Sequence, residues 1–300
     1  MLSLGVIFVT YNARTLLPAS LPPFLNSPFK PRILVLNSSS EDGTVEYARS
    51  LGCETLVVPR AEFNHGLSRE KARKALGTDI VVMVTPDAIL QDSSMLETLI
   101  RPIAAGDAAV SYARQIPHTG ADFFEAFPRF YNYPPQDQLR SLGTKEKFGS
   151  YTIFCSNSLA AWSNSALDAI GGFKEVLTGE DTLACAELLQ AGYRVAYASA
   201  CLVRHSHTYT LLQEFRRAFD TGYARKINCK AFAAFSRDER RGLGYAKRLL
   251  QQLLHDKPLQ VPYALANISC RYAGYLLGRL GPDLPPSLCR SLSGQEFYWK

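Results

Sequence analysis

Short apolar runs alternate with helix-like segments through the first half of this 300-residue chain. The apolar runs span residues 4–10, 32–36, 54–58 and 79–84, and helical patterns fall at 44–51 and 66–76 between them. Strand, helix and strand in repetition form right-handed crossovers, which place the strands parallel in one sheet with helices on both faces. We therefore predict an α/β fold on a mostly parallel sheet, continued by a helix near 95–103 and a strand near 108–114.

Polar residues follow three of these apolar runs directly. The stretches are "VTYN" at 9–12, "LNSSSEDGT" at 36–44 and "VTPDA" at 84–88. Ligands of open α/β sheets bind beyond the carboxyl ends of the strands, so the three stretches are expected to share one binding edge. Simpler interpretations exist, because polar turns are common after any strand: residues 36–44 could be only a capped turn, and Asp87 only a solvated loop charge.

The chain lacks the glycine cradles that usually hold phosphates. Neither G-x-x-x-x-G-K-[ST] nor a complete G-x-G-x-x-G after a strand occurs. A nucleotide diphosphate at this edge would then be neutralised by a divalent metal or by Arg and Lys, and Asp87 is a hard oxygen ligand in the expected place. The seven cysteines form no C-x-x-C pair, which favours a reducing cytosol over a disulfide framework or a zinc ribbon.

The second half is predicted to bring two further groups to the sheet. Residues 117–150 are expected to be irregular, 151–162 to form a strand, and 163–173 a short helix. "GEDTLACAELLQAGYRV" at 179–195 starts a helix with Glu180 and Asp181, where the helix dipole favours carboxylates and where capping alone explains one acid. "VRHSHTYT" at 203–210 places His205 and His207 on one side of a strand end, which favours a metal or phosphate site.

The ordered set of motifs resembles family 2 glycosyltransferases with the GT-A fold. The motifs are "VTYN", "LNSSSEDGT", "FNHGLSREKA", "VTPDA", "GEDTLACAELLQAGYRV" and "HSHTYT…EFRRAFDTG", which together cover residues 4 to about 225. Within the family the chain is most similar to bacterial rhamnosyltransferases that build lipopolysaccharide and other surface polysaccharides. The resemblance implies an inverting transfer of a sugar, most often L-rhamnose from dTDP-L-rhamnose, to a hydroxyl of a lipid-linked or oligosaccharide acceptor.

The resemblance also implies roles for individual residues. Asp181 would be the catalytic base with Glu180 as its neighbour, and Asp87 with His205 would hold Mg²⁺ or Mn²⁺. The nucleotide-sugar donor would be bound by residues from several motifs: Thr10, Tyr11, Asn37, Asp42, His65, Arg69, Arg216 and Arg217.

Two positions depart from the family pattern. Asn37 stands where many relatives have Asp, and its carbonyl still accepts a hydrogen bond from a base imide but carries no charge. Thr85 stands where the metal-binding D-x-D has its first acid, so a single carboxylate should hold its metal weakly without the phosphates of the donor. Two alternatives remain open at this point: a transferase that uses a UDP-sugar, and a catalytically silent nucleotide-binding scaffold.

Residues 210–300 differ in charge from the rest of the chain. They hold 15 Lys and Arg against 7 Asp and Glu, whereas the whole chain has a net charge of +6. We expect residues 1–209 to form the catalytic domain and 210–300 a basic helical extension. The leucines of "GLGYAKRLLQQLLHDK" at 242–257 would either bind an anionic membrane surface or dock on the catalytic domain. No apolar run is long enough to span a bilayer, so the expected location is cytoplasmic and peripheral to the membrane, with no nucleic acid as partner.

Overall fold

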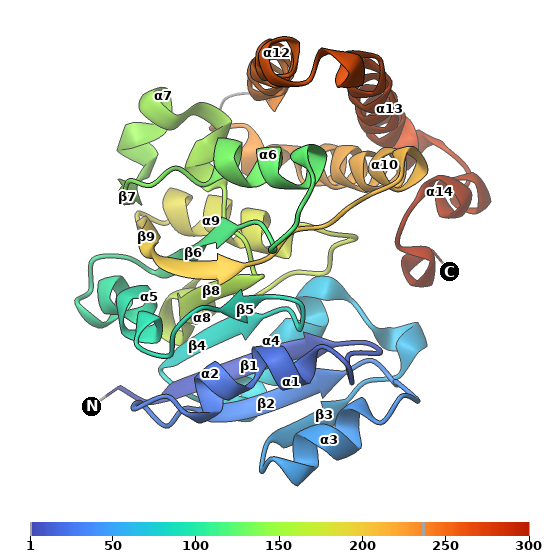
Figure 1. Ribbon diagram of the computed structural model, residues 1–300. Helices are drawn as coiled ribbons and strands as arrows, with labels where there is room; N and C mark the ends of the chain where they lie inside the picture. Colours follow the sequence, from blue (N-terminus) through green and yellow to red (C-terminus); the bar gives the residue numbers. More distant parts are fainter. Residues whose placement is uncertain (1, 236–237, 300) are drawn as a thin grey trace.

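The computed structural model describes residues 2–235 and 238–299, and in this part of the chain nine strands form one sheet (Figure 1). The strands are β1 (Leu4–Thr10), β2 (Arg32–Asn37), β3 (Glu54–Val57), β4 (Ile80–Val84), β5 (Ile89–Leu90), β6 (Val110–Ile116), β7 (Gln138–Arg140), β8 (Leu159–Ser163) and β9 (Val195–Arg204). Their order is β3-β2-β1-β4-β8-β6-β9-β5, with β7 paired to β9. The predicted α/β class and the predicted alternation of strands and helices are confirmed.

Helices cover both faces of the sheet. They are α1 (Leu17–Ser20), α2 (Pro22–Leu25), α3 (Thr44–Ser50), α4 (His65–Leu76), α5 (Met95–Ala104), α6 (Phe123–Asn132), α7 (Lys145–Phe148), α8 (Asn164–Ala169) and α9 (Glu180–Gln190). Successive residues of β1 point to opposite faces, so Ile7 joins a core with α4, α8 and α9, while Phe8 joins a core with α1, α2 and α5. Because both faces are covered, all of β4 is buried and reads as a continuous apolar run.

The sheet consists of a parallel half and a mixed half. β3, β2, β1 and β4 run parallel, and β8 enters antiparallel between β4 and β6. The prediction that residues 151–162 form one strand is wrong, because a 3₁₀ segment (Gly149–Ile153) and a loop precede β8. In that loop Asn157 and Ser156 make hydrogen bonds to side chains, and strand pairing with β4 begins only at Leu159, so the apolar composition of the segment did not produce one continuous strand.

Residues 117–150, which we predicted to be irregular, contain ordered elements. They are α6, β7, a 3₁₀ turn (Leu142–Thr144) and α7. Helix α6 starts at Asp122, whose carboxylate accepts from the backbone N–H of Glu125, and it continues through Pro128. Its buried Phe127 stacks on Phe123 at 5.6 Å between ring centroids. The proline and the aromatic residues hid an amphipathic helix from sequence reasoning.

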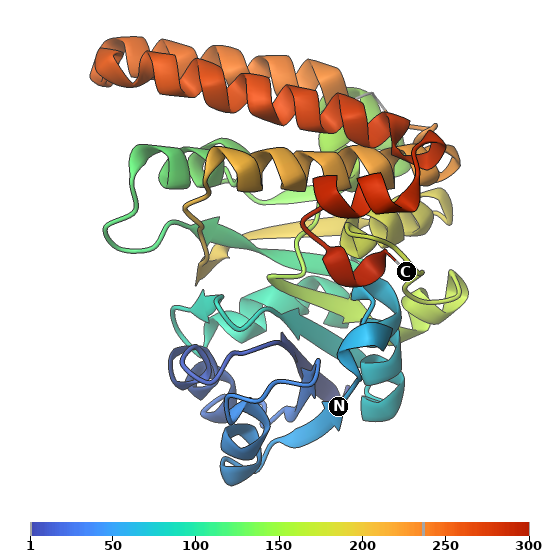
Figure 2. The same cartoon turned by 90° about the vertical axis from the view of Figure 1, so that its right-hand side faces the viewer.

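The chain after residue 210 is helical, as predicted. Its elements are α10 (Leu211–Ile227), α11 (Cys229–Phe232), α12 (Asp238–Asp256), α13 (Val261–Leu280), α14 (Pro286–Leu292) and a 3₁₀ turn, η6 (Glu296–Tyr298). Figure 2 shows α12 and α13 as a long antiparallel pair above α10. Helices α10 and α13 can approach closely because Gly278 has no side chain. A Cβ added at this position would lie 2.0 Å from the carbonyl oxygen of Phe219. No helix in the described residues is long and apolar enough to cross a membrane.

The leucine face of α12 is used in part for packing inside the protein. Leu249 and Leu253 are buried against Phe127 of α6 and Ala264 of α13. Leu243 and Leu254 stay exposed. Docking on the rest of the chain therefore accounts for the inner side of this helix, and the outer side remains free for another surface.

Candidate active site

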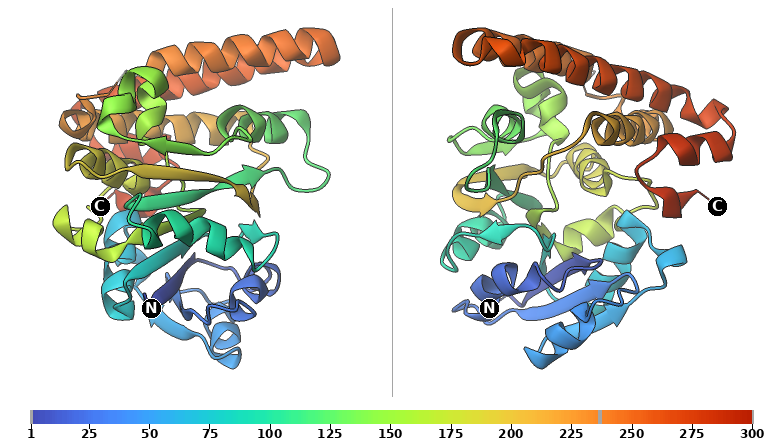
Figure 3. Two further views of the ribbon diagram at one scale, coloured as in Figure 1. Left: turned by 90° about the vertical axis from the view of Figure 1, so that its left-hand side faces the viewer. Right: turned by 45° about the vertical axis from the view of Figure 1, so that its right-hand side comes forward.

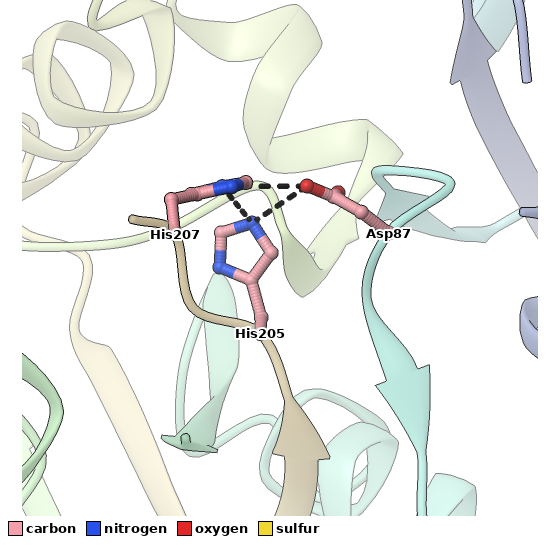
Figure 4. A group of neighbouring side chains, drawn as sticks. All are labelled: Asp87, His205 and His207. Carbon is pink, nitrogen blue, oxygen red and sulfur yellow. Dashed lines mark hydrogen bonds and ion pairs between the residues drawn. The ribbon is translucent and has the colours of Figure 1, made fainter. Parts of the chain in front are cut away.

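Three metal-ligating side chains converge where the two halves of the sheet meet. The Nε2 atoms of His205 and His207 lie 3.5 Å and 3.3 Å from Oδ2 of Asp87, and 3.0 Å from each other. Figure 4 shows both imidazole rings on the segment that follows β9, and the carboxylate of Asp87 reaching them from the loop after β4. The sequence pattern placed His205 and His207 together at a metal or phosphate site and the family resemblance assigned the metal to Asp87 and His205; the structure brings all three into one cluster.

Strand pairing explains why these residues meet. After β4 the chain turns at Thr85–Ala88, and the backbone N–H of Ala88 donates to the carbonyl of Thr85 at 3.0 Å. The short β5 then pairs antiparallel with the end of β9, with Ile89 opposite Arg204. This register sets Asp87 beside the residues that follow β9. The apolar strand β4 thus ends in a carboxylate that faces two imidazoles.

Gln115 of β6 determines which nitrogen of His205 faces the cluster. Its Oε1 lies 3.1 Å from Nδ1 of His205 and also accepts from Arg129, while its amide donates to Ser156 Oγ at 2.8 Å. Since an amide oxygen only accepts, the proton of His205 sits on Nδ1. The lone pair of Nε2 is then directed toward Asp87, as in metal sites where an outer partner orients the ligand.

The protonation states suit a divalent cation. Burial and the charge of His205 lower the pKa of His207 to about 4, and burial also lowers the pKa of His205. Burial acts to raise the pKa of Asp87, but the neighbouring imidazoles, His205 first and then His207, hold that pKa well below the usual range. Two neutral imidazoles and one carboxylate therefore stand ready as ligands at neutral pH, and this N, N, O set fits Mn²⁺ better than Mg²⁺.

Glu180 and Asp181 are the first two residues of helix α9, and their side chains lie in different environments. Glu180 is buried and forms an ion pair with Arg69 at 3.2 Å, and it accepts from the amide of Asn157 at 2.9 Å. Burial acts to raise the pKa of Glu180, but the charge of Arg69 lowers it. Burial and the charge of Glu180 raise the pKa of Asp181 to about 6.

The two acids therefore have different chemical capacities. Glu180 is a permanent carboxylate that is already neutralised by Arg69. Asp181 accepts from the backbone N–H groups of Asn157 at 3.1 Å and Thr182 at 2.6 Å, and from the Thr182 hydroxyl at 3.3 Å, and among the described residues no cation is paired to it. A carboxylate with a pKa near the working pH accepts a proton readily, so Asp181 has the properties of a general base.

Four of the predicted donor residues, Thr10, Tyr11, Asn37 and Asp42, lie at or just after the ends of β1 and β2, but not all of them are presented to a ligand. Asn37 is 0% exposed, donates to Thr10 Oγ1 and Ser40 Oγ, and accepts from the backbone N–H of Ser40. Asp42 accepts from the backbone N–H groups of Arg14 and Thr44. Asn37 and Asp42 therefore order the loops of this edge from within, and direct contact of Asn37 with a base is not what this structure presents.

Tyr11, by contrast, is 48% exposed at the same edge. The guanidinium of Arg60 lies over its ring at 4.0 Å, and Arg60 also donates to Ser38 Oγ at 2.9 Å. Arg60 belongs to a 3₁₀ turn, η1 (Arg60–Glu62), that follows β3. Sequence reasoning did not single out Arg60, because a lone arginine after a strand carries no motif.

The remaining predicted residues separate into two groups. Arg69 lies beneath the site as the partner of Glu180, and His65 beside it approaches Gln295 Oε1 with Nε2 at 3.3 Å. On α10, Arg217 lies 4.4 Å from the ring of Tyr209, which itself packs on His207. Arg216 instead approaches the backbone carbonyl of Ser291 at 3.5 Å. The structure thus brings Arg217 to the Asp/His cluster and turns Arg216 toward α14.

Comparison with known proteins places this site in a family. Residues 5–163 match the profile described as "Glycosyl transferase family 2". The chain is 34% identical over 302 residues to the O-antigen chain rhamnosyltransferase RfbN of Salmonella typhimurium, covering 99% of this chain and 96% of that protein. It is 36% identical over 270 residues to the O-antigen chain rhamnosyltransferase WbaN of Salmonella anatum, covering 89% and 86%.

Solved structures support the fold. The mannosyltransferase PcManGT of Pyrobaculum calidifontis, in complex with GDP-Man and Mn²⁺, superposes with a TM-score of 0.60 at 18% identity, covering 99% of this chain and 85% of that one. Residues 1–349 of S. aureus TarS superpose with a TM-score of 0.56 at 16% identity, covering 86% and 74%. At these identities the likeness shows a shared GT-A fold, which confirms the predicted fold class.

Proposed function

The chain belongs to glycosyl transferase family 2, and from this premise we propose that it transfers L-rhamnose from a nucleotide-activated donor, dTDP-L-rhamnose, to a hydroxyl of a growing surface polysaccharide. The observation that carries the proposal is that Asp181, a carboxylate with a raised pKa at the start of α9, is connected to the Asp/His cluster through the adjacent residues Asn157 and Ser158. The two relatives named as O-antigen chain rhamnosyltransferases support the choice of sugar and acceptor.

In the proposed inverting reaction, Asp181 takes the proton of the acceptor hydroxyl. The acceptor oxygen forms a bond to the anomeric carbon while the bond from that carbon to the diphosphate oxygen breaks, and the nucleoside diphosphate leaves with the electron pair. Asp87, His205 and His207 would hold a divalent cation, which supplies positive charge for the diphosphate when bound. Arg217, which lies beside Tyr209 and faces this cluster, would add a second positive charge.

The side chains around Asp181 favour proton transfer in one direction. Glu180 stays ionised because it is paired with Arg69, so it does not compete for the acceptor proton. Its negative charge nevertheless raises the pKa of Asp181. Asn157 donates to both acids and holds them in fixed relation. Base assistance of this kind contributes about 10²- to 10⁴-fold in rate.

A panel of sugar nucleotides tests the function. Purified enzyme with Mn²⁺ should transfer or slowly hydrolyse dTDP-L-rhamnose in preference to UDP-glucose, UDP-N-acetylglucosamine and GDP-mannose, and Asp181→Asn should abolish transfer. Asp107→Asn is the matched control, since this exposed Asp pairs with Arg194 on the surface at 3.6 Å. Preference for a UDP-sugar would contradict the rhamnose assignment. Turnover of no donor at all would favour a silent nucleotide-binding scaffold.

We also propose that α12 and α13 hold the enzyme at the anionic surface of the cytoplasmic membrane, where a lipid-linked acceptor would reside. The turn between these helices projects from the rest of the molecule (Figures 2 and 3), and Leu259 in this turn is 95% exposed. The exposed leucines Leu243 and Leu254 lie on α12 together with Lys247 and Arg248. Each basic residue near such a surface contributes about 1 kcal/mol.

Liposome sedimentation tests this attachment. The enzyme should pellet with vesicles containing phosphatidylglycerol and stay in solution with purely zwitterionic vesicles. Leu259→Glu should reduce the bound fraction without lowering the melting temperature, since the side chain is exposed. Binding that ignores both anionic lipid and salt concentration would contradict the proposal.

A further inference from the structure

The C-terminal segment 293–299 returns from the helices to the donor edge of the sheet. Figures 2 and 3 show it descending from α14 toward the start of α4. Its base is anchored on buried Asp220 of α10, which accepts from Ser293 Oγ at 2.6 Å and from the backbone N–H of Gly294 at 3.0 Å. The segment is therefore held in a defined position rather than lying loosely on the surface.

Phe297 and Gln295 of this segment contact the donor-edge residues directly. The ring of Phe297 packs on Phe63 with 5.3 Å between centroids, and the guanidinium of Arg60 lies 4.5 Å from the centroid of Phe297. Arg60 also lies 4.0 Å from the centroid of Tyr11. Gln295 approaches His65 as described above. Arg60 is thus clamped between one ring from β1 and one ring from the C-terminal segment.

This clamp has a chemical consequence. A guanidinium carries five N–H donors in one plane, and rings on its faces leave the edge of that plane for acceptors. One donor of Arg60 is used by Ser38 Oγ. Asn37 is buried and Asp42 is engaged by its own loop, whereas Arg60 keeps further N–H donors beside the exposed Tyr11.

We propose that Arg60, clamped by Tyr11 and Phe297, recognises a carbonyl oxygen of the nucleotide base of the donor, and that the C-terminal segment is therefore part of the donor site. The inference rests on the proposed function, because it needs a nucleotide donor at this edge. It assigns specificity to two residues, Arg60 and Phe297, that lie more than 230 positions apart in the chain.

Binding of dTDP in the presence of Mn²⁺, measured by calorimetry, tests the proposal. Arg60→Ala and Phe297→Ala should each weaken dTDP binding by about 3- to 30-fold, the range that a cation–π contact spans. The double variant should be no weaker than Arg60→Ala alone, since Phe297 acts through Arg60. Inorganic pyrophosphate should bind all variants equally, because it lacks a base.

Tyr298→Ala is the matched control, since this neighbouring aromatic ring packs on Trp299 instead. It should leave dTDP binding unchanged, and melting temperatures should verify that every variant is folded. Additive losses in the double variant, or equal losses for pyrophosphate, would overturn the proposal while leaving the proposed function intact. Failure of the unmodified enzyme to bind dTDP or UDP would overturn the proposed function, and this inference with it.

Discussion

Asp181→Asn and Glu180→Gln should change the stability of the enzyme in opposite directions, although each removes one negative charge from the start of α9. The pKa of Asp181 is raised by burial and by Glu180, so keeping this carboxyl ionised at neutral pH costs folding free energy. A group whose folded pKa lies above its unfolded value of 3.8 makes stability fall as pH rises from about 4 to about 6. The neutral Asn removes that cost.

The magnitudes follow from the contacts. A rise in pKa from 3.8 to about 6 corresponds to at most about 3 kcal/mol of folding free energy, which Asp181→Asn would regain. The substitution also loses one of the two backbone hydrogen bonds to the carboxylate, which costs roughly 1 kcal/mol or more. Asp181→Asn should therefore leave the free energy of unfolding at pH 7.5 unchanged or raise it by up to about 2 kcal/mol. Glu180→Gln leaves Arg69 buried without its partner, which costs about 3–5 kcal/mol.

Urea denaturation at pH 7.5 measures the stability difference, and the pH dependence of kcat/KM measures the chemistry. In the unmodified enzyme kcat/KM should fall about tenfold per pH unit below pH 6 as Asp181 is protonated. The charge of Glu180 raises the pKa of Asp181, so in Glu180→Gln this acid limb should move to lower pH. Equal destabilisation by both substitutions, together with an unmoved limb, would refute the assignment of base and neighbour.

Three further predictions concern the cluster and the helices. Asp87→Ala and His207→Ala should both abolish tight Mn²⁺ binding, and Mn²⁺ should outcompete Mg²⁺ on the unmodified enzyme, as measured by electron paramagnetic resonance of free Mn²⁺. Gln115→Ala should lower Mn²⁺ affinity about 10- to 100-fold although Gln115 is not a ligand, and unaltered affinity would contradict its orienting role. Leu253→Ala should cost about 2–5 kcal/mol in urea denaturation, whereas exposed Leu254→Ala should cost less than about 0.5 kcal/mol.

The parallel half of the sheet could be predicted because each of its strands is a local signal. β1, β2 and β4 are continuous apolar runs that end in polar turns, and strand ends in such a sheet meet at one edge. The antiparallel strand β8 carries no comparable signal, since its pairing depends on β4 and β6 rather than on its own sequence. The same holds for β5, which is two residues long and exists through its pairing with β9.

The position of a site residue could be predicted where a local sequence motif fixes it, and not where contacts between distant parts of the chain decide it. Asp87 and His205 fall where expected, because a strand end and a strand exit bring them to the same edge. Asn37 was expected to present its carbonyl, but three hydrogen bonds within the loop engage it. Phe297 could not be found from sequence, because its contact with Arg60 spans most of the chain.

The loop before β8 explains how the proposed base on α9 and the Asp/His cluster keep a fixed relation although they lie on separate elements. Asn157 donates to Glu180 through its amide and to Asp181 through its backbone N–H. The adjacent Ser158 accepts from the backbone N–H of Thr85 through its carbonyl, and its hydroxyl lies 3.4 Å from Nε2 of His205. Two consecutive buried residues therefore connect α9, the turn after β4 and the end of β9.

This connection gives a physical reason why Thr85 can stand where the D-x-D pattern has its first acid. The backbone N–H at this position donates to Ser158, and that contact does not depend on the side chain. In the proposed metal site the second imidazole, His207, would supply the ligand that an acid at position 85 would otherwise provide. A carboxylate at position 85 would add negative charge beside Asp87 and shift the ligand set from N, N, O toward oxygen, which favours harder cations such as Mg²⁺. The combination of Thr85 with His207 is therefore consistent with a site tuned toward Mn²⁺.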